Sequence, residues 1–281
     1  MNYNFLILGG DKRIVFLAKG LAKEGNIVYT YGNKVEEITE IDKKENIKNY
    51  KYDIVISSMP LTKDYENIYS PLSNKNIKID ELKELASGKI LIAGKFPNNF
   101  EIEAEKNNIK CYDILNDEVT TILNTIPTAE GALQVAMEET NYTLTGKKAL
   151  ILGFGRVGKV LANKLAKFGL DIYCEARKEN DLAWIRAYGY KDIKLEDMKN
   201  HLCKMNIIFN TIPTKILDKS TLILLNKNTV IIDLASAPGG VDYEVANKLG
   251  IKAILASALP GKVAPLTTAE YLQEFVKKVI K

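Results

Sequence analysis

Three glycines at a fixed spacing are the strongest chemical signal in the sequence. They follow the apolar run 149–152 directly, and a segment with helical periodicity, 159–167, comes after them. In a strand–turn–helix unit, such glycines permit a tight turn, let a pyrophosphate approach the backbone and let the helix pack closely on the strand, with the helix N-terminus facing the phosphates. We therefore predict that a nicotinamide dinucleotide binds at Gly153-Phe154-Gly155-Arg156-Val157-Gly158.

The end of the next predicted strand decides which dinucleotide binds. About 20 residues after the glycines, an NAD enzyme needs a carboxylate for the ribose hydroxyls, whereas a cation there pairs with the 2′-phosphate of NADP. Ala176 occupies the acidic position and is followed by Arg177 and Lys178, so we predict NADP. Two alternatives stay open. A shift of one residue in strand register would make Glu175 the ribose ligand and favour NAD, or the two cations could be a solvated strand end.

A repeated pentapeptide marks further polar residues. The sequence Asn-Thr-Ile-Pro-Thr occurs at 124–128 and at 210–214, each time after an apolar run that we interpret as a strand. Ligands of open α/β sheets gather at the carboxyl ends of strands, so both copies are expected at a ligand cleft, although Asn and Pro are also common turn residues. The residues expected to line the nicotinamide ribose are Asn210, Thr211, Ile212, Pro213 and Ala235.

The first predicted strand is also followed by glycines, but without the dinucleotide spacing. Gly9 and Gly10 lack the later glycines of the fingerprint, so we do not expect a second cofactor site there. Asp11 and Arg13 follow this turn, near a cleft expected between two domains. The planar guanidinium of Arg13 could bind a substrate carboxylate.

Short apolar runs alternate with helical segments along the chain, which is typical of parallel sheets covered by helices. This pattern predicts an α/β protein with two doubly wound domains: a flavodoxin-like N-terminal domain at 1–127 and a Rossmann NAD(P)-binding domain at 128–265. A helix N-capped by Thr128 should join the domains, and a last helix within 266–281 could pack on the first. The predicted strands are 4–8, 26–30, 52–57, 89–93, 109–113, 119–123, 148–152, 170–174, 206–209, 229–232 and 252–255.

Composition limits the classes of function. The 281 residues carry a net charge of +4, spread as single lysines among acids, so nucleic-acid binding is not expected. No apolar segment approaches the roughly 18 residues needed to cross a bilayer, and the first residues indicate a strand rather than a signal peptide, so no membrane association is expected. Cys111, Cys174 and Cys203 have no paired spacing, which argues against disulfides and metal sites and favours a cytoplasmic location.

Taken together, the motifs resemble those of the family formed by the A subunits of dipicolinate synthase. The resemblance covers nearly the whole chain and is densest from 117 to 269. The combination of motifs is more specific than the dinucleotide fingerprint alone. Besides that fingerprint, the resemblance is carried by Asp11 and Arg13 after Gly-Gly, by Ile126-Pro127-Thr128-Ala129-Glu130-Gly131, Asn141-Tyr142-Thr143, Asn210-Thr211-Ile212-Pro213, Asp233-Leu234-Ala235-Ser236, Pro238-Gly239-Gly240-Val241-Asp242 and Leu259-Pro260-Gly261-Lys262-Val263-Ala264-Pro265.

The resemblance implies an activity, partners and a fold. The activity is the NADP-dependent oxidation of dihydrodipicolinate, formed from 4-hydroxy-tetrahydrodipicolinate, in the mother cell of a sporulating bacterium. The implied partner is a flavoprotein B subunit, and the implied arrangement of domains is that of 2-hydroxyacid dehydrogenases; the chain could also form a homo-oligomer. The sequence departs from the family at Ala237, where an arginine is usual, and at Lys262, where an aliphatic residue is usual. Lys262 could therefore replace the missing charge.

The implied reaction sets requirements for the site. A hydride transfer that aromatises a dicarboxylated ring needs cations for the carboxylates and a base for one proton. We expect the base to be Glu130 or Asp11, although Glu130 could instead only favour the dipole of its helix. The residues expected to bind the substrate are Arg13, Thr128, Ser236, the amides of Gly239 and Gly240, Pro260 and Lys262.

Other functions fit parts of the same pattern. A catalytically silent NADP-binding subunit that scaffolds or senses for its partner would keep the glycine turn and show no turnover, and another small-carboxylate dehydrogenase would keep the fold. The segment 260–267 is also similar to methylenetetrahydrofolate dehydrogenases. That family needs a Tyr-x-x-x-Lys motif, and no tyrosine between residues 3 and 69 is followed by Lys four residues later. The folate hypothesis is therefore disfavoured.

Overall fold

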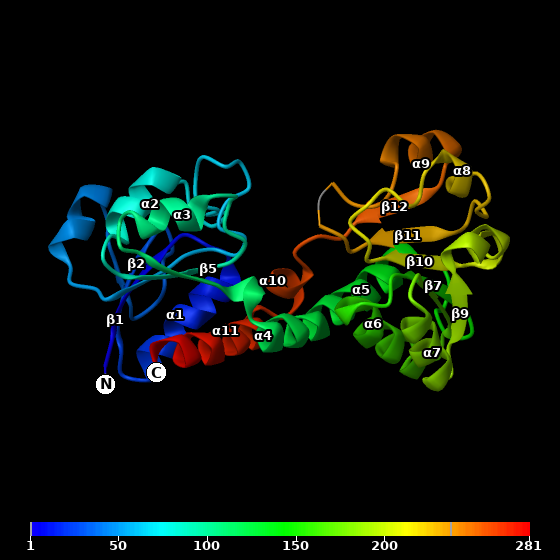
Figure 1. Ribbon diagram of the computed structural model, residues 1–281, viewed down its shortest axis with the longest axis horizontal. Coiled ribbons are helices and arrows are strands. Elements are labelled where there is room, and N and C mark those ends of the chain that lie inside the picture. Colours follow the sequence, from blue (N-terminus) through cyan, green and yellow to red (C-terminus); the bar gives the residue numbers. More distant parts are fainter. Residues whose placement is uncertain (1, 237) are drawn as a thin grey trace. The chain divides into compact units, whose positions relative to one another are not determined.

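The computed structural model describes residues 2–236 and 238–281, which form two compact units (Figure 1). One unit consists of the chain up to Asn124 together with Ala264–Lys281, and the other of Thr125–Val263. Within the described ranges, no helix is long and apolar enough to cross a membrane.

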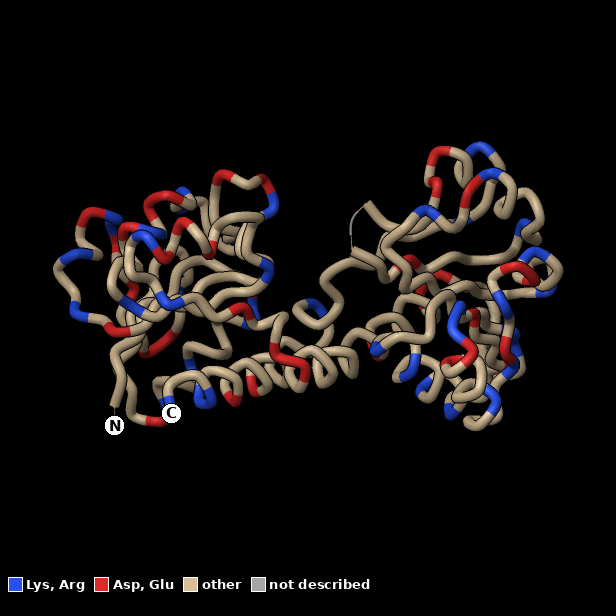
Figure 2. Tube along the Cα trace, in the orientation of Figure 1, with Lys and Arg blue, Asp and Glu red and all other residues tan. Residues whose placement is uncertain are grey.

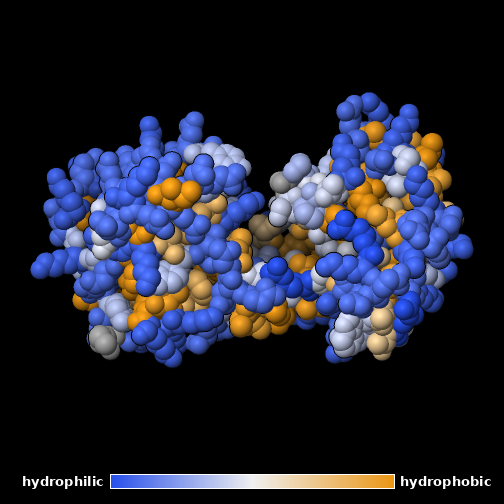
Figure 3. Space-filling view, viewed as in Figure 1, coloured by the Kyte–Doolittle hydropathy of each residue, from blue (hydrophilic) through white to orange (hydrophobic). Residues whose placement is uncertain are grey.

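The surfaces of both units are polar and mixed in charge. Basic and acidic residues are both distributed over the helices and loops of each unit (Figure 2), and hydrophilic residues cover most of the face seen in Figure 3. Many of these charges are paired, as are Lys83 and Glu103 at 2.6 Å. Exposed pairs contribute about 0–1 kcal/mol each, so the buried interior has to hold the fold.

The N-terminal unit alternates strands and helices. Its elements are β1 (Asn4–Leu8), α1 (Lys12–Lys23), β2 (Ile27–Tyr31), β3 (Thr39–Glu40), β4 (Ile54–Ile56), α2 (Ile79–Leu85), β5 (Ile90–Ala93), α3 (Phe100–Glu105), β6 (Lys110–Asp113), α4 (Glu118–Leu123) and α11 (Pro265–Ile280), with short 3₁₀ turns η1 (Lys44–Asn49) and η2 (Ile114–Asn116). In the described residues the strands form one parallel sheet in the order β3-β2-β1-β4-β5-β6. Without the two-residue β3, this is the flavodoxin order.

Residues of β1 alternate between the two faces of this sheet. Phe5 and Ile7 belong to the cluster formed with α1 and α11, whereas Leu6 and Leu8 belong to the cluster formed with α2 and α3. All of them are fully buried. A strand covered on both faces explains why the sequence shows a continuous apolar run here rather than an alternating pattern.

The helix α11 belongs to the N-terminal unit although it comes last in the chain. It lies alongside α1 (Figure 1), and its Leu272 and Val276 are buried in the same cluster as Leu17. The helices approach closely at Gly20, because a β-carbon built there would overlap Oε1 of Gln273. The C-terminal segment therefore completes the core of this unit.

The segment at 119–123, predicted as a strand, is helix α4. Asp117 caps it, because the carboxylate accepts hydrogen bonds from the amide of Thr120 at 2.9 Å and from its hydroxyl at 2.8 Å. A local cap of this kind overrides the β-preference of a short run of Val, Thr and Ile. The predicted N-cap at Thr128 is also wrong, since α5 (Thr125–Glu139) begins earlier and contains Thr128. The first Asn-Thr-Ile-Pro-Thr copy thus opens a helix and does not follow a strand.

The second unit contains the predicted strands and one more. Its further elements are β7 (Lys148–Leu152), α6 (Arg156–Lys167), β8 (Asp171–Ala176), α7 (Glu179–Ala187), β9 (Lys191–Lys194), the 3₁₀ turns η3 (Leu195–Asn200) and η4 (Leu202–Lys204), β10 (Ile207–Asn210), α8 (Lys219–Leu222), β11 (Val230–Asp233), α9 (Tyr243–Leu249), β12 (Lys252–Leu255) and α10 (Leu259–Val263). The order of the parallel strands across the described sheet is β12-β11-β10-β7-β8-β9, which is the Rossmann order with its switch point between β7 and β10. Strand β9, with its polar sequence, was not predicted.

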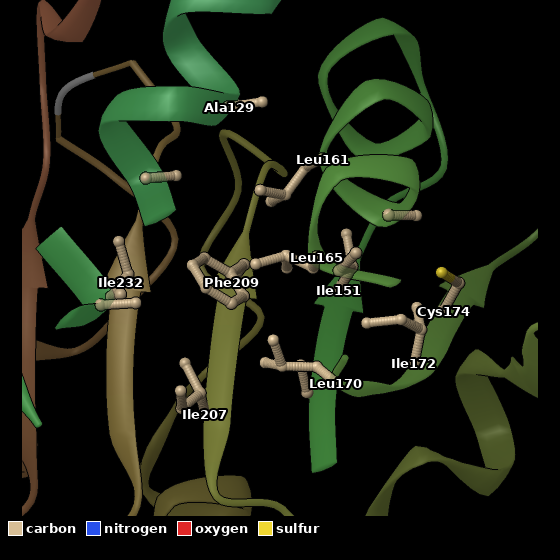
Figure 4. Packing of buried hydrophobic residues seen from close by; sticks show 14 of the residues in the cluster. Ala129, Ile151, Leu161, Leu165, Leu170, Ile172, Cys174, Ile207, Phe209 and Ile232 are labelled. Atoms are coloured by element: carbon tan, nitrogen blue, oxygen red, sulfur yellow. The ribbon is translucent and has the colours of Figure 1, made fainter. Parts of the chain in front are cut away.

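The core of the second unit packs α6 onto the centre of its sheet. Ile151 of β7 and Phe209 of β10 lie against Leu161 and Leu165 of α6 (Figure 4), and all four side chains are fully buried. Removal of a buried aromatic such as Phe209 typically costs about 3–5 kcal/mol. This packing fixes the carboxyl end of β7, where the glycine turn begins.

Asp117 offers a test of how α4 and α11 stabilise the N-terminal unit. Besides capping α4, its carboxylate forms an ion pair with Lys278 of α11. This lysine and the hydrogen bonds from Thr120 lower the pKa of Asp117 to about 2. A depressed carboxyl pKa stabilises the folded state above the unfolded pKa, here 3.8, and the contribution is lost as the pH falls through the folded pKa.

We expect Asp117→Ala to lower the free energy of unfolding at pH 7 by about 1 kcal/mol, because α4 loses its N-cap. The deficit should shrink as the pH falls from about 4 toward 2, as denaturant titrations followed by circular dichroism would show. Asp117→Asn keeps a capping side chain and removes the ion pair, so its deficit should be smaller. A deficit that grows toward acid would contradict this account.

Candidate dinucleotide site

The three glycines of the turn have different surroundings. Gly153 has a φ of +88°, and a β-carbon there would lie 2.7 Å from Oγ1 of Thr211. A β-carbon at Gly158 would overlap the carbonyl oxygen of Gly153. At Gly155, by contrast, such a carbon would have no atom within 4 Å among the described residues other than those adjoining it in the chain. Two glycines therefore allow the turn and the helix to pack, and Gly155 leaves room for a ligand.

The helix begins inside the turn. Its first residue is Arg156, earlier than the expected start at 159, and Gly155 is its extended N-cap. The amide groups of the first turn of α6 therefore lie next to the space above Gly155, and they attract phosphate together with the helix dipole. Phe154 is buried, Val157 is half-buried and Arg156 is exposed. This arrangement fits a dinucleotide pyrophosphate.

The residues after β10 hold the neighbouring strand ends together. Thr211 donates its hydroxyl to the carbonyl of Leu152 at 2.8 Å, and the fully buried Asn210 accepts from the amide of Ile212 at 3.1 Å. Pro213 is exposed beyond them. The second Asn-Thr-Ile-Pro-Thr copy thus forms a loop with a fixed conformation beside the glycine turn.

Asp233, the last residue of β11, organises the next loop. Its fully buried carboxylate accepts from Nδ2 of Asn210 at 2.8 Å, the amide of Ala235 at 3.1 Å, the amide of Gly240 at 2.7 Å and the hydroxyl of Tyr243 at 2.8 Å. Burial and the bond to Asp233 raise the pKa of Tyr243. An acid at the end of a buried strand, followed by Gly-Gly and Tyr, was the available signal.

The structure changes the role expected for the glycines of Pro-Gly-Gly. The amide of Gly240 donates to Asp233, and the amide of Gly239 donates to the carbonyl of Ser236 at 2.9 Å. The two amides therefore donate within the chain. We had expected them to bind a substrate carboxylate. A β-carbon at Gly239 would overlap Oδ2 of Asp233, so the glycine is needed for the loop to close on this carboxylate. Ser236 is exposed, Ala235 is buried, and Ala237 lies outside the described residues.

Glu175 is buried at the end of β8. It pairs with Leu152 in the sheet and is 1% exposed. Its Oε2 accepts from the amide of Gly153 at 3.2 Å, an amide that also donates to the carbonyl of Glu175 at 3.2 Å. Its Oε1 has no hydrogen-bond partner among the described residues. Burial raises the pKa of Glu175, while the Gly153 amide and the charge of Arg177 oppose the shift.

The residues that follow β8 lie outside the sheet. Ala176 is buried as the last residue of the strand, and Arg177 and Lys178 are exposed directly after it. Ala176 packs in the core cluster that contains α6, whereas Glu175 faces the other side of the sheet. Arg177 and Lys178 therefore lie at the carboxyl end of β8. In Rossmann domains, the adenosine ribose of the dinucleotide binds near this strand end.

The motifs around Thr128 and Pro260 meet within the second unit. Helix α10 packs on α5, and a β-carbon at Gly131 would lie 2.9 Å from the β-carbon of Leu259. Pro260 is buried, Lys262 is exposed and Thr128 is half-buried. Glu130 forms an ion pair with Lys164 of α6 at 2.8 Å, and its side chain is 52% exposed. The glycine of the Glu-Gly pair thus has a packing role that sequence reasoning missed.

Asp11 and Arg13 come together in the N-terminal unit. Nε and Nη2 of Arg13 donate to both oxygens of Asp11 at 2.8–3.1 Å, and Nη2 also donates to the carbonyl of Met59 at 2.5 Å. Asp11 also caps α1 through the amide of Arg13. The arginine side chain is 6% exposed. The Arg13 guanidinium is therefore held in one orientation, and the carboxylate of Asp11 balances its charge.

Among residues 2–236 and 238–281, no group of three His, Cys, Asp or Glu side chains is arranged to hold a metal ion.

The different surroundings of the glycines lead to a paired prediction. Gly158→Ala should lower the free energy of unfolding by about 1–3 kcal/mol, because the methyl group meets the Gly153 carbonyl. Gly155→Ala should change it by less than about 0.5 kcal/mol but raise the Kd for NADP+ about tenfold or more, since the methyl group enters the space for the pyrophosphate. Calorimetric melting and titration separate the effects. Equal destabilisation by both variants would contradict this assignment.

Comparisons with known proteins extend over both units. The family model of the N-terminal domain of the dipicolinate synthase A subunit matches residues 4–115, and that of the D-isomer specific 2-hydroxyacid dehydrogenase NAD binding domain matches residues 126–257. The chain is 30% identical over 283 residues to the dipicolinate synthase A subunit of Bacillus subtilis strain 168, covering 98% of this chain and 94% of that protein.

Solved structures give the same result. The dipicolinate synthase A subunit of Bacillus halodurans is similar with a TM-score of 0.89 and 27% identity, covering 99% of this chain and 97% of that one. D-lactate dehydrogenase of Escherichia coli has a TM-score of 0.65 at 11% identity, covering 98% and 95%, which shows a shared fold. The expected α/β fold, with a flavodoxin-like sheet in the N-terminal unit and a Rossmann sheet in the second, is confirmed, and the second unit matches a dehydrogenase-type NAD binding domain. The chain belongs to the family of dipicolinate synthase A subunits.

Proposed function

We propose that this chain is the NADP-dependent A subunit of a dipicolinate synthase and oxidises dihydrodipicolinate to dipicolinate. The observation that carries the proposal is the glycine turn, open at Gly155, in a chain related to this family over 98% of its length. When bound, NADP+ accepts a hydride from the substrate ring. The second hydrogen leaves as a proton, so the products are dipicolinate, NADPH and H+. The substrate would arise from 4-hydroxy-tetrahydrodipicolinate by loss of water, in the mother cell of a sporulating bacterium.

The preference for NADP rests on the end of β8. Arg177 and Lys178 are exposed there, and the buried Ala176 offers no carboxylate for the ribose hydroxyls. A guanidinium binds a phosphate through paired, charge-assisted hydrogen bonds. Glu175 is the acidic residue of this segment, but its carboxyl faces the opposite side of the sheet from α6. We therefore assign the 2′-phosphate to Arg177 and Lys178, while Asn210, Thr211, Ile212, Pro213 and Ala235 line the nicotinamide ribose.

The substrate carboxylates require positive charge. Because the amides of Gly239 and Gly240 are engaged, we assign a substrate carboxylate to the cation Lys262, with Thr128, Ser236 and Pro260 of the same unit lining the substrate. In the N-terminal unit, Arg13 remains the proposed carboxylate ligand. Asp11 fixes the orientation of Arg13 through both of its oxygens. Lys262 is exposed on α10, a short helix held against α5 by the close contact at Gly131.

Glu130 is the better of the two proposed bases. Asp11 is tied to Arg13, whose side chain is nearly buried, whereas the side chain of Glu130 in its pair with Lys164 is about half exposed. An exposed ion pair is worth about 0–1 kcal/mol, so Glu130 can leave Lys164 at small cost and accept a proton. Asp11 would then act as a positioning residue for Arg13.

The name of the relatives implies an assembly. The B. subtilis and B. halodurans proteins are A subunits, and we propose that this chain likewise works with a B subunit, which the family resemblance identifies as a flavoprotein. We propose a cytoplasmic location for the complex.

The activity can be tested directly. Freshly made 4-hydroxy-tetrahydrodipicolinate is supplied with NADP+ or NAD+, with and without the B subunit, and dipicolinate absorbance and NADPH formation are followed together. We expect equal amounts of both products with NADP+. Glu130→Gln should bind NADP+ normally and lose most of the turnover, because the proton acceptor is removed. No product under any combination, with NADP+ bound, would overturn the enzyme assignment in favour of a silent NADP-binding protein.

The cofactor preference has its own test. Arg177→Ala should raise the Kd for NADP+ by about 10- to 100-fold, since a hydrogen-bonded charge pair is worth about 1.5–3 kcal/mol, and should leave the Kd for NAD+ nearly unchanged. Arg186→Ala removes an exposed arginine that is paired with Asp192, and serves as the matched control. Equal losses for NADP+ and NAD+ in Arg177→Ala would show that this arginine does not contact the 2′-phosphate.

A further inference from the structure

Asp233 and Glu175 are buried carboxyl groups at the same edge of the sheet, and their surroundings differ. Asp233 accepts hydrogen bonds from Asn210, Ala235, Gly240 and Tyr243, so that within the described residues each of its oxygens has two donors. Both oxygens of Asp233 are therefore fully supplied with donors. Glu175 has the single amide of Gly153, which it shares with its own backbone carbonyl, and its Oε1 is buried without a partner among the residues described. A buried charge with so few donors is costly.

The groups around Glu175 supply little compensation for a charge. On β7 and its turn, the polar neighbour is the Gly153 amide, and on β9 the paired residue is Ile193. Tyr173 lies two residues earlier on the same face of β8. Lys191 lies over its ring and is paired with Asp171. The ring centroids of Tyr173 and His201 are 6.3 Å apart. From η3, Met198 is buried on this side, while its charged residues Glu196, Asp197 and Lys199 are exposed. Arg177, at the exposed end of β8, is the cation whose charge acts on Glu175.

A dinucleotide would remove even this compensation. The pyrophosphate is negatively charged and binds over the turn whose Gly153 amide contacts Glu175, so an ionised Glu175 would repel it across a poorly solvated distance. The 2′-phosphate of NADP would pair with Arg177 and withdraw that cation from Glu175. Both effects favour the neutral carboxyl when the cofactor is bound.

We propose that the dinucleotide binds to this protein with Glu175 neutral, so that cofactor binding takes up a proton at Glu175, and that the uptake is larger for NADP than for NAD. The carboxyl oxygen gains a proton and no other bond changes. This inference rests on the proposed dinucleotide binding at the glycine turn. It makes Glu175 a positioning residue of the cofactor site, one that couples cofactor affinity to pH without contacting the reacting atoms.

The test is isothermal titration of NADP+ and NAD+ into the full chain between pH 6.5 and 9, in buffers that differ in ionisation enthalpy. For the wild type we expect an uptake of up to one proton and a Kd for NADP+ that rises with pH, approaching tenfold per pH unit. Glu175→Gln, a neutral isostere, should show no proton uptake and a nearly flat Kd for NAD+, and with NADP+ it should show only the protons that the 2′-phosphate releases on pairing with cations. NAD+, which lacks that phosphate, isolates the contribution of the protein.

Glu179→Gln is the matched control. It removes a carboxylate close by in the sequence that is exposed and paired with Lys194, so it should keep the wild-type pH dependence. Infrared difference spectra of the wild type, free and bound, provide a readout that needs no variant, because a protonated carboxyl band should appear on binding. The same proton count in wild type and Glu175→Gln, or no such band, would overturn the inference. Absence of dinucleotide binding at every pH would instead overturn the proposed function.

Discussion

The carboxylate of Asp233 is the interaction on which the ligand-binding edge of the second unit depends. It joins the loop after β10, through Asn210, to the loop after β11, through Ala235 and Gly240. Loops at the ends of parallel strands have no ladder partners of their own, so a buried acceptor that satisfies several donors gives them a unique conformation. Glycine is needed at the two positions before Val241, because this carboxylate and the side-chain amide of Asn210 occupy the space that a β-carbon would take. The loop that was expected to bind a carboxylate of the substrate is built around a carboxylate of the protein.

At the same edge, the glycine turn holds its strand, its helix and the neighbouring loop in close contact. The helix α6 can start at Arg156 only because Gly158 lies against the carbonyl of Gly153, and Gly153 in turn fits against Thr211. Strand, turn, helix and the neighbouring loop are therefore in contact around a short stretch of backbone. Gly155 is left outside these contacts, and the space beside it is open.

Much of the architecture could be predicted from the sequence, because buried parallel strands leave continuous apolar runs and the glycine spacing stands between a strand pattern and a helix pattern. The predictions failed where one polar contact decided the outcome. A cap at Asp117 converts 119–123 into a helix, and the polar strand β9 carries no apolar run that could have marked it. The site was predicted less well than the fold, since which donor an amide or carboxylate finds depends on loops distant in the sequence. The occupied amide of Gly240, the ion pair of Glu130 and the close contact between Gly131 and Leu259 are examples.

The place of α11 has a consequence for how the chain folds during synthesis. The chain leaves the N-terminal unit at Asn124, forms the whole of the second unit and returns at Ala264. On the ribosome, a nascent protein ordinarily folds its first domain first. Here the cluster that contains Leu17 and Leu21 of α1 stays incomplete until Leu272 and Phe275 have been translated. The N-terminal unit is therefore the one whose core is completed last during synthesis.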